Sequence, residues 1–354
     1  MSKLKIGVIF GGVSSEHDVS KISGTSVITN LYKEKYDITP IYIDKTGNWY
    51  TYEKNINEIQ ILDIDSDISK DIKPILNIGE ILKSLDVTFP VLHGLAGEDG
   101  SIQGLFELFN TPYVGCGILA SSVGMDKVYT KIIFEKAGIK QAKYNYIRKF
   151  NNNYIYVDKE FNEEVLNIDE VVQRIDNNLG FPMFIKPSNS GSSVGINKAN
   201  NIKELKNAIE YAARFDKKIL IEEEIIGKEV ECAVLGNEEV ISSCVGEIKP
   251  AEEFYTFDAK YKNKESKVVI PADISEETSN KIRNLAIKAF KAINGKGLSR
   301  VDFFTNEETN EIYINEINTL PGFTTISMYP KLFEKVGIKY ADLLDKLINL
   351  ALER

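Results

Sequence analysis

Residues 299–324 place polar side chains at matching points of two consecutive strands. Because side chains alternate between the faces of a strand, Arg300, Asp302 and Phe304 are expected on one face of the first strand. By the same alternation, one face of the second strand holds Ile312, Ile314, Glu316 and Asn318. Buried carboxylates need a cation or a basic partner, and oxygen ligands favour Mg²⁺ that also holds a nucleotide phosphate. The hairpin therefore predicts metal-assisted phosphate chemistry, with a surface hairpin of solvated acids as the alternative.

A second candidate site is the run KPSNSGSSVGI at residues 186–196. Lys186 ends an apolar strand, and a loop rich in glycine and serine follows it. Backbone N–H groups in such a loop can converge on phosphate oxygens, while the lysine adds a positive charge. The spacing of a Walker A loop is absent. Phosphate binding and a plain flexible turn are both compatible with this run.

Acids and a histidine follow two early strands. His93 and Glu98 come after the apolar run VTFPVL, at the carboxyl end of a strand, where open α/β sheets bind ligands. Glu16 follows the glycine turn after the first strand. The alternatives are a histidine that only packs and acids that only favour a helix N-terminus. These residues are candidates for a substrate pocket.

Two further runs carry weaker signals. Residues 252–261, EEFYTFDAKY, mix aromatics with Lys260 and Tyr261, which is typical of a lid or of a hydrophobic edge. By its local pattern, the acidic run at 222–224 is a solvated strand end. A nearby carboxylate such as Glu229 could accept hydrogen bonds from ribose hydroxyls.

Composition excludes several classes of partner. The 354 residues, 43% of them hydrophobic, are enough for two or three packed units. A net charge of -9 opposes binding along a nucleic-acid backbone or an anionic membrane. The N-terminus lacks a signal-peptide pattern, and no apolar run reaches the roughly 18 residues of a membrane span. We therefore expect a cytoplasmic protein that acts on small molecules.

The first third of the chain alternates strands with helices, which predicts an α/β fold with a parallel sheet. Strands are expected at 5–10, 38–44, 87–94 and 111–117, with helices at 77–84 and 101–109. A second unit begins near a helix at 126–137, which Asp126 caps and Gly138 ends. The remaining expected strands are at 181–187, 218–225 and 228–236, with helices at 202–213, 277–293 and 340–352. The Asn-rich stretch 145–170 is interpreted as a hairpin or a loop insertion.

The motifs occur in a fixed order: GGVSSEHDVS, HGLAGEDGSIQG, GMDK, KPSNSGSSVG, IEEEIIGKE, AKY, RVDFF and NEINTLPGFT. This order resembles the D-alanine:D-alanine ligase family of the ATP-grasp superfamily. The resemblance implies an N-terminal Rossmann-like, pre-ATP-grasp domain at 1–121 that binds substrate. It also implies a central ATP-grasp subdomain at 122–226 with a phosphate-binding lid, and a C-terminal ATP-grasp subdomain at 227–354 with the metal and acceptor sites.

The resemblance also assigns roles around the amino acids. Glu16 would hold the amino group of the first D-alanine, in a pocket lined by His93 and Glu98. Ser192 and Tyr261 would join Glu16 in a hydrogen-bonded latch that closes the lid. Arg300 and the N–H of Gly322 would stabilise the oxyanion. Ser327 and Met328 would bind the carboxylate of the second D-alanine.

For the nucleotide, the resemblance implies a larger set of contacts. The phosphates would be bound by Lys127, Lys186, Ser193 and Lys260. Adenine and ribose would be contacted by Glu222, Glu223, Ile225 and Glu229. Two Mg²⁺ (or Mn²⁺) ions would be bound by Asp302, Glu316 and Asn318.

The implied reaction activates one D-alanine as an acyl phosphate with ATP, after which the amine of a second D-alanine displaces phosphate. Met328 and Tyr261 favour D-alanine as the acceptor, because relatives that make the lactate ester resemble one another in having arginine at the former position. A D-alanine:D-serine or D-alanine:D-lactate ligase is the alternative within the family. A nucleotide-binding module without turnover is the alternative outside it. A homodimer is expected, because relatives are usually dimers.

Overall fold

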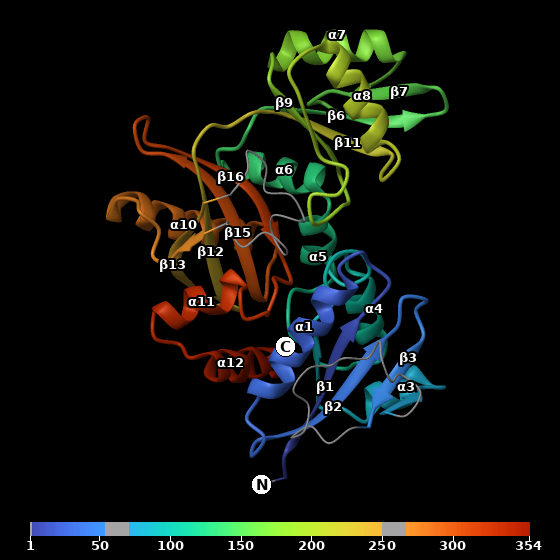
Figure 1. Ribbon diagram of the computed structural model, residues 1–354, viewed down its shortest axis with the longest axis vertical. Coiled ribbons are helices and arrows are strands. Elements are labelled where there is room, and N and C mark those ends of the chain that lie inside the picture. The colour runs from blue at the N-terminus through green and yellow to red at the C-terminus, as the bar shows by residue number, and fades with distance from the viewer. Residues whose placement is uncertain (1, 54–70, 250–266) are drawn as a thin grey trace.

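The computed structural model describes residues 2–53, 71–249 and 267–354. Within these ranges the chain forms three sheets, one after another along the sequence. Figure 1 shows the units that contain them, with the central unit at the top and the first and third units below it. The prediction of an α/β fold that begins with a parallel sheet is confirmed.

The first unit is built on the strand order β4-β3-β2-β1-β5. The strands β2, β1 and β5 are parallel, and β3 and β4 extend the sheet beyond β2 as antiparallel strands. The strands are β1 (Leu4–Gly11), β2 (Tyr36–Ile43), β3 (Trp49–Tyr52), β4 (Ile72–Pro74) and β5 (Val87–Pro90). The helices are α1 (His17–Asn30), α3 (Ile78–Lys83), α4 (Ser101–Leu108) and α5 (Ile118–Met125). Because β1 and β5 run in parallel, the loops after them lie at the same edge of the sheet.

Two expected strands of this unit are wrong in part. Strand β5 ends at Pro90 instead of continuing to residue 94. The segment 111–117 forms only an isolated bridge, between Thr88 and Tyr113. Pro112 has no N–H to donate, and Gly115 turns the chain with a φ of 111°. The ladder therefore cannot extend beyond that bridge.

The central unit is an antiparallel sheet with the order β10-β9-β11-β6-β7-β8. Its strands are β6 (Tyr144–Phe150), β7 (Asn153–Val157), β8 (Glu163–Leu166), β9 (Met183–Pro187), β10 (Asn197–Ala199) and β11 (Lys218–Glu223). Its helices are α7 (Ile168–Leu179) and α8 (Ile202–Ala212), and α6 (Lys127–Lys136) precedes the sheet. The stretch 145–170 does form a hairpin, but it supplies β6, β7 and β8, so the alternative of a loop insertion is wrong.

The third unit is an antiparallel sheet with the order β14-β13-β12-β15-β16. Its strands are β12 (Lys228–Gly236), β13 (Val240–Lys249), β14 (Lys267–Val269), β15 (Gly297–Asn306) and β16 (Glu311–Asn318). Its helices are α10 (Glu276–Ala292), α11 (Met328–Lys335) and α12 (Tyr340–Leu352). Figure 1 shows α12 between this sheet and the first unit.

The predicted metal hairpin, β15 with β16, contains a bulge. Asp302 pairs with Glu316, but the next pair is Phe303 with Ile314, so Asn315 is an extra residue. The extra residue reverses the faces of β16, and Ile314 packs in the core beside Phe303. The expectation that Ile312 and Ile314 share a face with Glu316 is therefore wrong. The expectation for β15 holds, because Arg300 and Asp302 bond to each other on one face.

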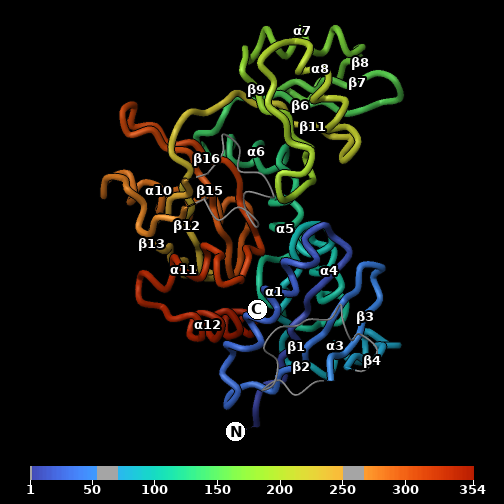
Figure 2. Tube along the Cα trace, in the orientation of Figure 1, coloured from blue at the N-terminus to red at the C-terminus, as the bar shows by residue number. Residues whose placement is uncertain are grey.

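The first and third units share one hydrophobic core, whereas the central unit has its own. Phe10 and Val27 of the first unit belong to the same buried cluster as Tyr329 and Leu347 of the third. The buried cluster of the central sheet takes its members only from residues 147–221. The tube in Figure 2 shows the same division, with α12 close to α1 and the central sheet set apart.

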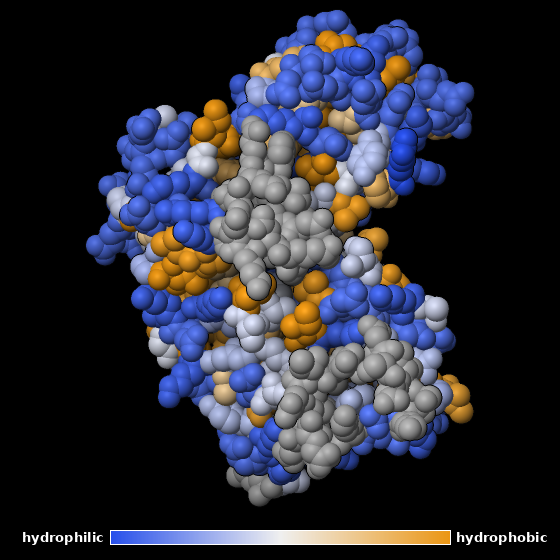
Figure 3. Space-filling model, in the orientation of Figure 1, coloured by the Kyte–Doolittle hydropathy of each residue, from blue (hydrophilic) through white to orange (hydrophobic). Residues whose placement is uncertain are grey.

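The surface is mostly polar. Figure 3 shows a largely hydrophilic face on which apolar residues occur in small groups. Among residues 2–53, 71–249 and 267–354, none of the helices combines the length and the apolar character that crossing a bilayer demands.

Candidate active site

A cavity of about 700 Å³ lies where the three units meet. It gathers predicted residues that are far apart in the sequence. The first unit contributes Glu16, His93 and Glu98. The central segment contributes Lys127, Lys186, Ser192 and Ser193. The third unit contributes Glu229, Arg300, Glu316, Asn318, Gly322, Ser327 and Met328.

A second cavity, of about 490 Å³, adjoins the first between the central and third units. Lys186 and Glu229 line both cavities. The predicted residues Glu222, Glu223 and Ile225 line the second cavity, beside apolar side chains that are typical of a site for a flat ring. These apolar residues are Phe184, Ile248, Phe304 and Ile314. Lys260 and Tyr261, also predicted for this region, lie outside the described residues.

Glu16 lies at the contact between the first unit and the loop at 188–196. It is the N-cap residue of α1, but its side chain does not cap the helix. Instead, the hydroxyl of Ser192 donates a hydrogen bond to Glu16 Oε1. A Cβ on Gly94 would lie 2.8 Å from Glu16 Oε2, and one on Gly191 would lie 3.2 Å away. Glycine at both positions lets backbone approach the carboxylate closely, so Glu16 does more than place a negative charge at the N-terminus of α1.

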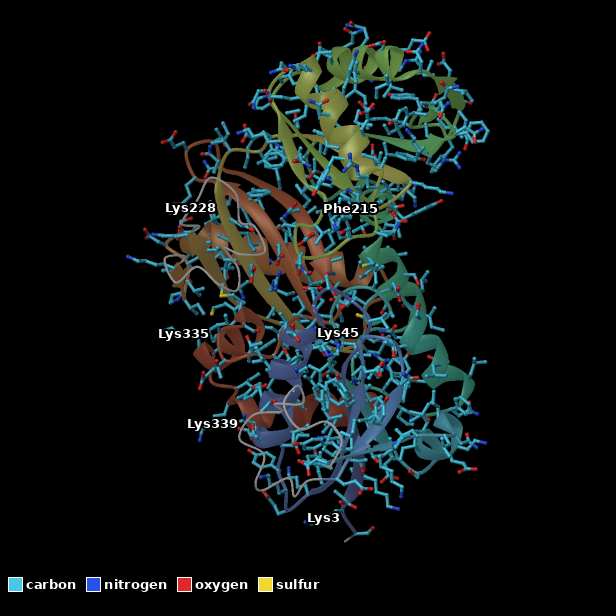
Figure 4. All side chains as sticks on the ribbon, turned by 45° about the vertical axis from the view of Figure 1, so that its right-hand side comes forward. Lys3, Lys45, Phe215, Lys228, Lys335 and Lys339 are labelled. Atoms are coloured by element: carbon cyan, nitrogen blue, oxygen red, sulfur yellow. The ribbon has the colours of Figure 1, made fainter. Side chains whose placement is uncertain are left out.

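The loop at 188–196 is held at both ends. The hydroxyl of Ser188 donates to Asp126 Oδ1 at 2.6 Å. At the other end, a Cβ on Gly195 would lie 2.8 Å from the ring of Phe215, which is labelled in Figure 4. Between these ends, Ser192 and Ser193 both adopt positive φ, at 50° and 60°. Left-handed serines on an anchored loop fit a segment that is built to present polar groups to a ligand.

Glu98 and His93 lie beside Glu16 in the first cavity. Helix α4 begins only at Ser101, and Glu98 Oε1 instead accepts from the N–H of Gly94 at 2.8 Å. The surrounding protein and then the nearby Glu16 raise the pKa of Glu98 to about 8. Burial lowers the pKa of His93, although Glu16 and a backbone hydrogen bond with Leu320 oppose this shift. At neutral pH both groups are therefore mainly in their uncharged forms.

Arg300 is the centre of a charged cluster on the third sheet. Its Nε and Nη2 donate to the two oxygens of Asp302, each at 2.7 Å. Glu231 Oε2 also lies 3.0 Å from Arg300 Nε. Asn318 Nδ2 donates to Asp302 Oδ2 at 3.0 Å. Glu231 was not predicted, although its alternation with Glu229 along β12 places both acids on one face.

Glu222 is buried, so the interpretation of the acidic run as a solvated strand end is wrong at this residue. Its two oxygens form ion pairs with Lys186 and with Lys131, the latter at 2.9 Å. Burial alone would raise the pKa of Glu222, but the two ammonium groups outweigh it and hold the pKa at about 2. Lys131 was not predicted, and its position four residues after Lys127 on one helix was the available signal. Glu223, the residue after Glu222, accepts a hydrogen bond from the N–H of Lys143 at 2.8 Å.

Lys127 and the loop at 319–327 between β16 and α11, here called the acceptor loop, complete the first cavity. Lys127 Nζ donates to the carbonyl oxygen of Ser190 at 2.6 Å and lies 4.0 Å from Glu316 Oε2. The hydroxyl of Ser327 accepts from the N–H of Thr324 at 3.0 Å and lies 2.7 Å from the position of a Cβ on Gly322. Only glycine at position 322 therefore leaves room for this turn.

Comparisons with known proteins agree with this arrangement. The family model described as D-ala D-ala ligase N-terminus matches residues 5–116, and the one described as D-ala D-ala ligase C-terminus matches residues 133–349. The chain is 52% identical to the D-alanine–D-alanine ligase of Acetivibrio thermocellus, over 99% of this chain and 96% of that protein. It is 48% identical to the corresponding ligase of Clostridium acetobutylicum, over 99% of each chain.

Solved structures show the same fold. The VanG D-Ala:D-Ser ligase from Enterococcus faecalis matches with a TM-score of 0.86 and 38% identity, over 99% of this chain and 100% of that one. The D-alanine-D-alanine ligase from Coxiella burnetii matches with a TM-score of 0.83 and 33% identity, over 100% and 95%. Together with the two family models, these similarities show that the chain belongs to the D-alanine–D-alanine ligase family.

Proposed function

We propose that the protein uses ATP to join two D-alanine molecules into D-alanyl-D-alanine, a precursor of peptidoglycan. One observation carries the proposal. A single cavity brings Glu16 and Glu98 of the first unit opposite Arg300 and Gly322 of the third, beneath the glycine- and serine-rich loop of the central unit. This cavity joins one that has apolar walls and room for a nucleotide base.

Glu16 is assigned to the ammonium group of the first D-alanine. It is buried, and its carboxylate accepts a hydrogen bond from the hydroxyl of Ser192. A cationic amine would give this carboxylate the charge partner that burial demands. Glu98 beside it is mainly protonated at neutral pH, which limits the local charge to one carboxylate. His93 completes the pocket in its neutral form.

The nucleotide is assigned to the boundary of the two cavities. Lys186 lines both of them and would reach the phosphates, together with Lys127, Ser193 and Lys260. Glu222 holds Lys186 in place, while Glu223 and Ile225 line the wall for adenine. Glu229 lies at the same boundary and can accept hydrogen bonds from ribose hydroxyls.

Asp302, Glu316 and Asn318 fit a Mg²⁺ site that is completed by the nucleotide. Among the described residues, no group of three or more His, Cys, Asp and Glu side chains could hold a metal by itself. Magnesium is commonly bound by one or two carboxylates plus substrate phosphates, which is what the paired Asp302 and Glu316 offer. Because Asn318 donates its amide nitrogen to Asp302, its amide oxygen is the atom that a cation would use. Two bound ions would offset charge on the transferred phosphoryl group.

The chain's own groups then account for the chemistry. Transfer of the γ-phosphoryl group to the first D-alanine gives an acyl phosphate, and the second amine attacks its carbonyl carbon. Arg300 and the N–H of Gly322 would stabilise the oxyanion that forms. The loop that carries Ser192, latched to Glu16 and Tyr261, would exclude water from the intermediate. Ser327 and Met328 would bind the carboxylate of the second amino acid.

D-Serine is the competing second substrate, because one similar solved structure is a D-Ala:D-Ser ligase. The chain is more similar to proteins named D-alanine–D-alanine ligase, at 52% identity against 38%. Met328 is buried and apolar, and its Cε would clash with a Cβ on Gly246 at 2.4 Å. A thioether in this place can pack against a methyl group but offers a serine hydroxyl only a weak acceptor.

Release of phosphate from ATP tests the proposal. We expect release that requires D-alanine, is not supported by L-alanine, and yields D-alanyl-D-alanine. Glu316→Gln and Asp302→Asn should keep the wild-type circular dichroism spectrum but lower turnover by orders of magnitude, because each removes one carboxylate ligand. ATP hydrolysis that is independent of D-alanine, with no dipeptide, would contradict the proposed function.

A further inference from the structure

Ser23 links two walls of the active-site cavity. It is fully buried in α1 and lines neither wall itself. Its hydroxyl lies 2.9 Å from Nε2 of His93, which is in the wall of the first unit. The same oxygen lies 3.4 Å from the backbone nitrogen of Phe323, which follows Gly322 in the acceptor loop of the third unit. The hydroxyl of Ser23 therefore contacts two groups that lie 70 and 300 residues after it in the sequence.

The N–H of Phe323 fixes the direction of one hydrogen bond, and we assign the other so that the single hydrogen of the Ser23 hydroxyl is also used. The backbone N–H of Phe323 can only donate, so Ser23 Oγ accepts from it. The single hydrogen of the Ser23 hydroxyl is then free to donate to Nε2 of His93. This requires a neutral imidazole with its proton on Nδ1. The backbone of Leu320 raises the pKa of His93, which agrees with this assignment, because a group that favours the protonated imidazole acts as a hydrogen-bond acceptor.

The segment 320–323 of the acceptor loop is thus held at both of its ends. His93 contacts the backbone of Leu320, and Ser23 accepts from the N–H of Phe323. On the far side, the hydroxyl of Tyr340 donates to the carbonyl oxygen of Phe323 at 3.1 Å. Gly322 lies between the two contacts, so its N–H belongs to the segment that they hold.

We propose that Ser23 is a positioning residue that fixes the Leu320–Phe323 segment and ties it to His93. It thereby sets the place of the Gly322 N–H relative to the pocket of the first amino acid. The inference rests on the proposed function for its effect on catalysis, but not for the hydrogen-bond network itself. A small error in the placement of such a group can lower a rate by about 10²-fold.

Ser20 provides a matched control on the same helix. It is also fully buried, and its hydroxyl also joins two backbone groups, accepting from the N–H of Gly11 at 2.8 Å and donating to the carbonyl of Val91. Neither partner belongs to the acceptor loop. Ser20→Ala and Ser23→Ala should therefore destabilise the fold to a similar degree, and only the latter should alter the acceptor loop.

The network can be tested without substrate by nitrogen NMR of the imidazoles, because the chain has only two histidines. His17, which contacts the carbonyl of Gly12 and the hydroxyl of Tyr42, serves as an internal reference. In the wild-type protein we expect His93 to be protonated on Nδ1 and to accept at Nε2. Ser23→Ala should shift the Nε2 signal, whereas Ser20→Ala should not. Protonation of His93 on Nε2 in the wild type would overturn the proposal, even if the variant failed to fold.

Steady-state kinetics then separate positioning from general stability. Ser23→Ala should lower kcat by about tenfold to a hundredfold and leave the KM for ATP near its wild-type value. Ser20→Ala should keep the wild-type kcat at temperatures where both variants are folded. An equal kcat for the two variants would overturn the proposal. A wild-type protein that makes no dipeptide, yet shows the expected imidazole signals, would instead contradict the proposed function alone.

Discussion

The first unit meets the other two units through unlike interfaces. Against the third unit it shares a continuous hydrophobic core, and tyrosine–aspartate hydrogen bonds reinforce the contact. Tyr32 donates to Asp342 and Tyr36 donates to Asp345, each at 2.6 Å. Against the central unit it has the contact between Glu16 and Ser192, at the tip of a loop.

This difference separates the two ends of the active site. The proposed pocket for the amino acids lies largely between the first and third units, which one core holds together. The site for the nucleotide lies beside a unit with an independent core. Movement of the central unit could open this end while the shared core keeps the first and third units together. The same movement would make and break the hydrogen bond between Ser192 and Glu16.

The largest expected effect is loss of Arg300 from the amino-acid end. Arg300→Met leaves Asp302 and Glu231 buried without their cation. We expect kcat to fall by about 10²–10³-fold and the free energy of unfolding to fall by about 3–5 kcal/mol. Phosphate release and urea unfolding measure the two effects. The control Arg174→Met removes an exposed ion pair with Glu164, and should change the free energy of unfolding by less than about 1 kcal/mol. Wild-type turnover in Arg300→Met would refute its assignment.

A matched pair of large-to-small substitutions tests whether the two hydrophobic cores are separate. Leu347→Ala removes a side chain from the shared core and Ile209→Ala removes one from the central core. Each should cost about 2–5 kcal/mol. Amide hydrogen exchange should accelerate in both β1 and β12 for the first variant, and only within residues 144–223 for the second. Acceleration confined to the third unit in Leu347→Ala would show that the shared core does not couple the two units.

The pH dependence of stability isolates Glu98. Its pKa is raised to about 8 in the folded protein, against about 4.3 in the unfolded chain, so the folded state binds more protons between these values. The resulting stabilisation is complete below about pH 4.3 and is lost as the pH rises through 8. Glu98→Gln should remove this slope, which is at most about 1.4 kcal/mol per pH unit. Urea unfolding at several pH values compares the variants, and parallel curves would argue against a raised pKa.

The smallest expected effect is the coupling across the loop contact. Ser192→Ala removes the hydrogen bond and Glu16→Gln weakens it by removing the charge of the acceptor, so their effects on kcat/KM should be non-additive by about 0.5–3 kcal/mol. The same behaviour is expected for Ser192→Ala with Tyr261→Phe if all three residues form the latch. Ser190→Ala, whose hydroxyl contacts the carbonyl of Val194, is the control and should be additive with Glu16→Gln. Simple addition in the first cycle would remove the latch from the account.

Local patterns predicted much of the fold, because they depend on near neighbours. Asp126 accepts from the N–H groups of Val128 and Tyr129 as an N-cap, and Gly138 follows the helix with a φ of 64°, as expected. The bulge at Asn315 was not predictable, because register is decided by the partner strand.

In the candidate site, too, contacts between residues far apart in the sequence could not be predicted. The order of the motifs indicated which residues would meet, and the cavity brings most of them together. The spacing from Lys127 indicates which helix face holds Lys131, but no pattern in the sequence pairs Lys131 with Glu222, 91 positions away. The link between Ser23 and Phe323 is of the same kind, since a serine on the inner face of a helix has no distinguishing local signal.

A competition between second substrates tests the central claim most directly. The purified protein is incubated with ATP, Mg²⁺ and equal concentrations of D-alanine and D-serine, and the dipeptides are identified by mass spectrometry. Because Met328 discriminates against a hydroxyl only by lacking a strong partner, the preference should be worth about 1–3 kcal/mol. We predict D-alanyl-D-alanine as the dominant product with D-alanyl-D-serine as a minor one. A dominant D-alanyl-D-serine product would contradict the assignment of D-alanine as the second substrate.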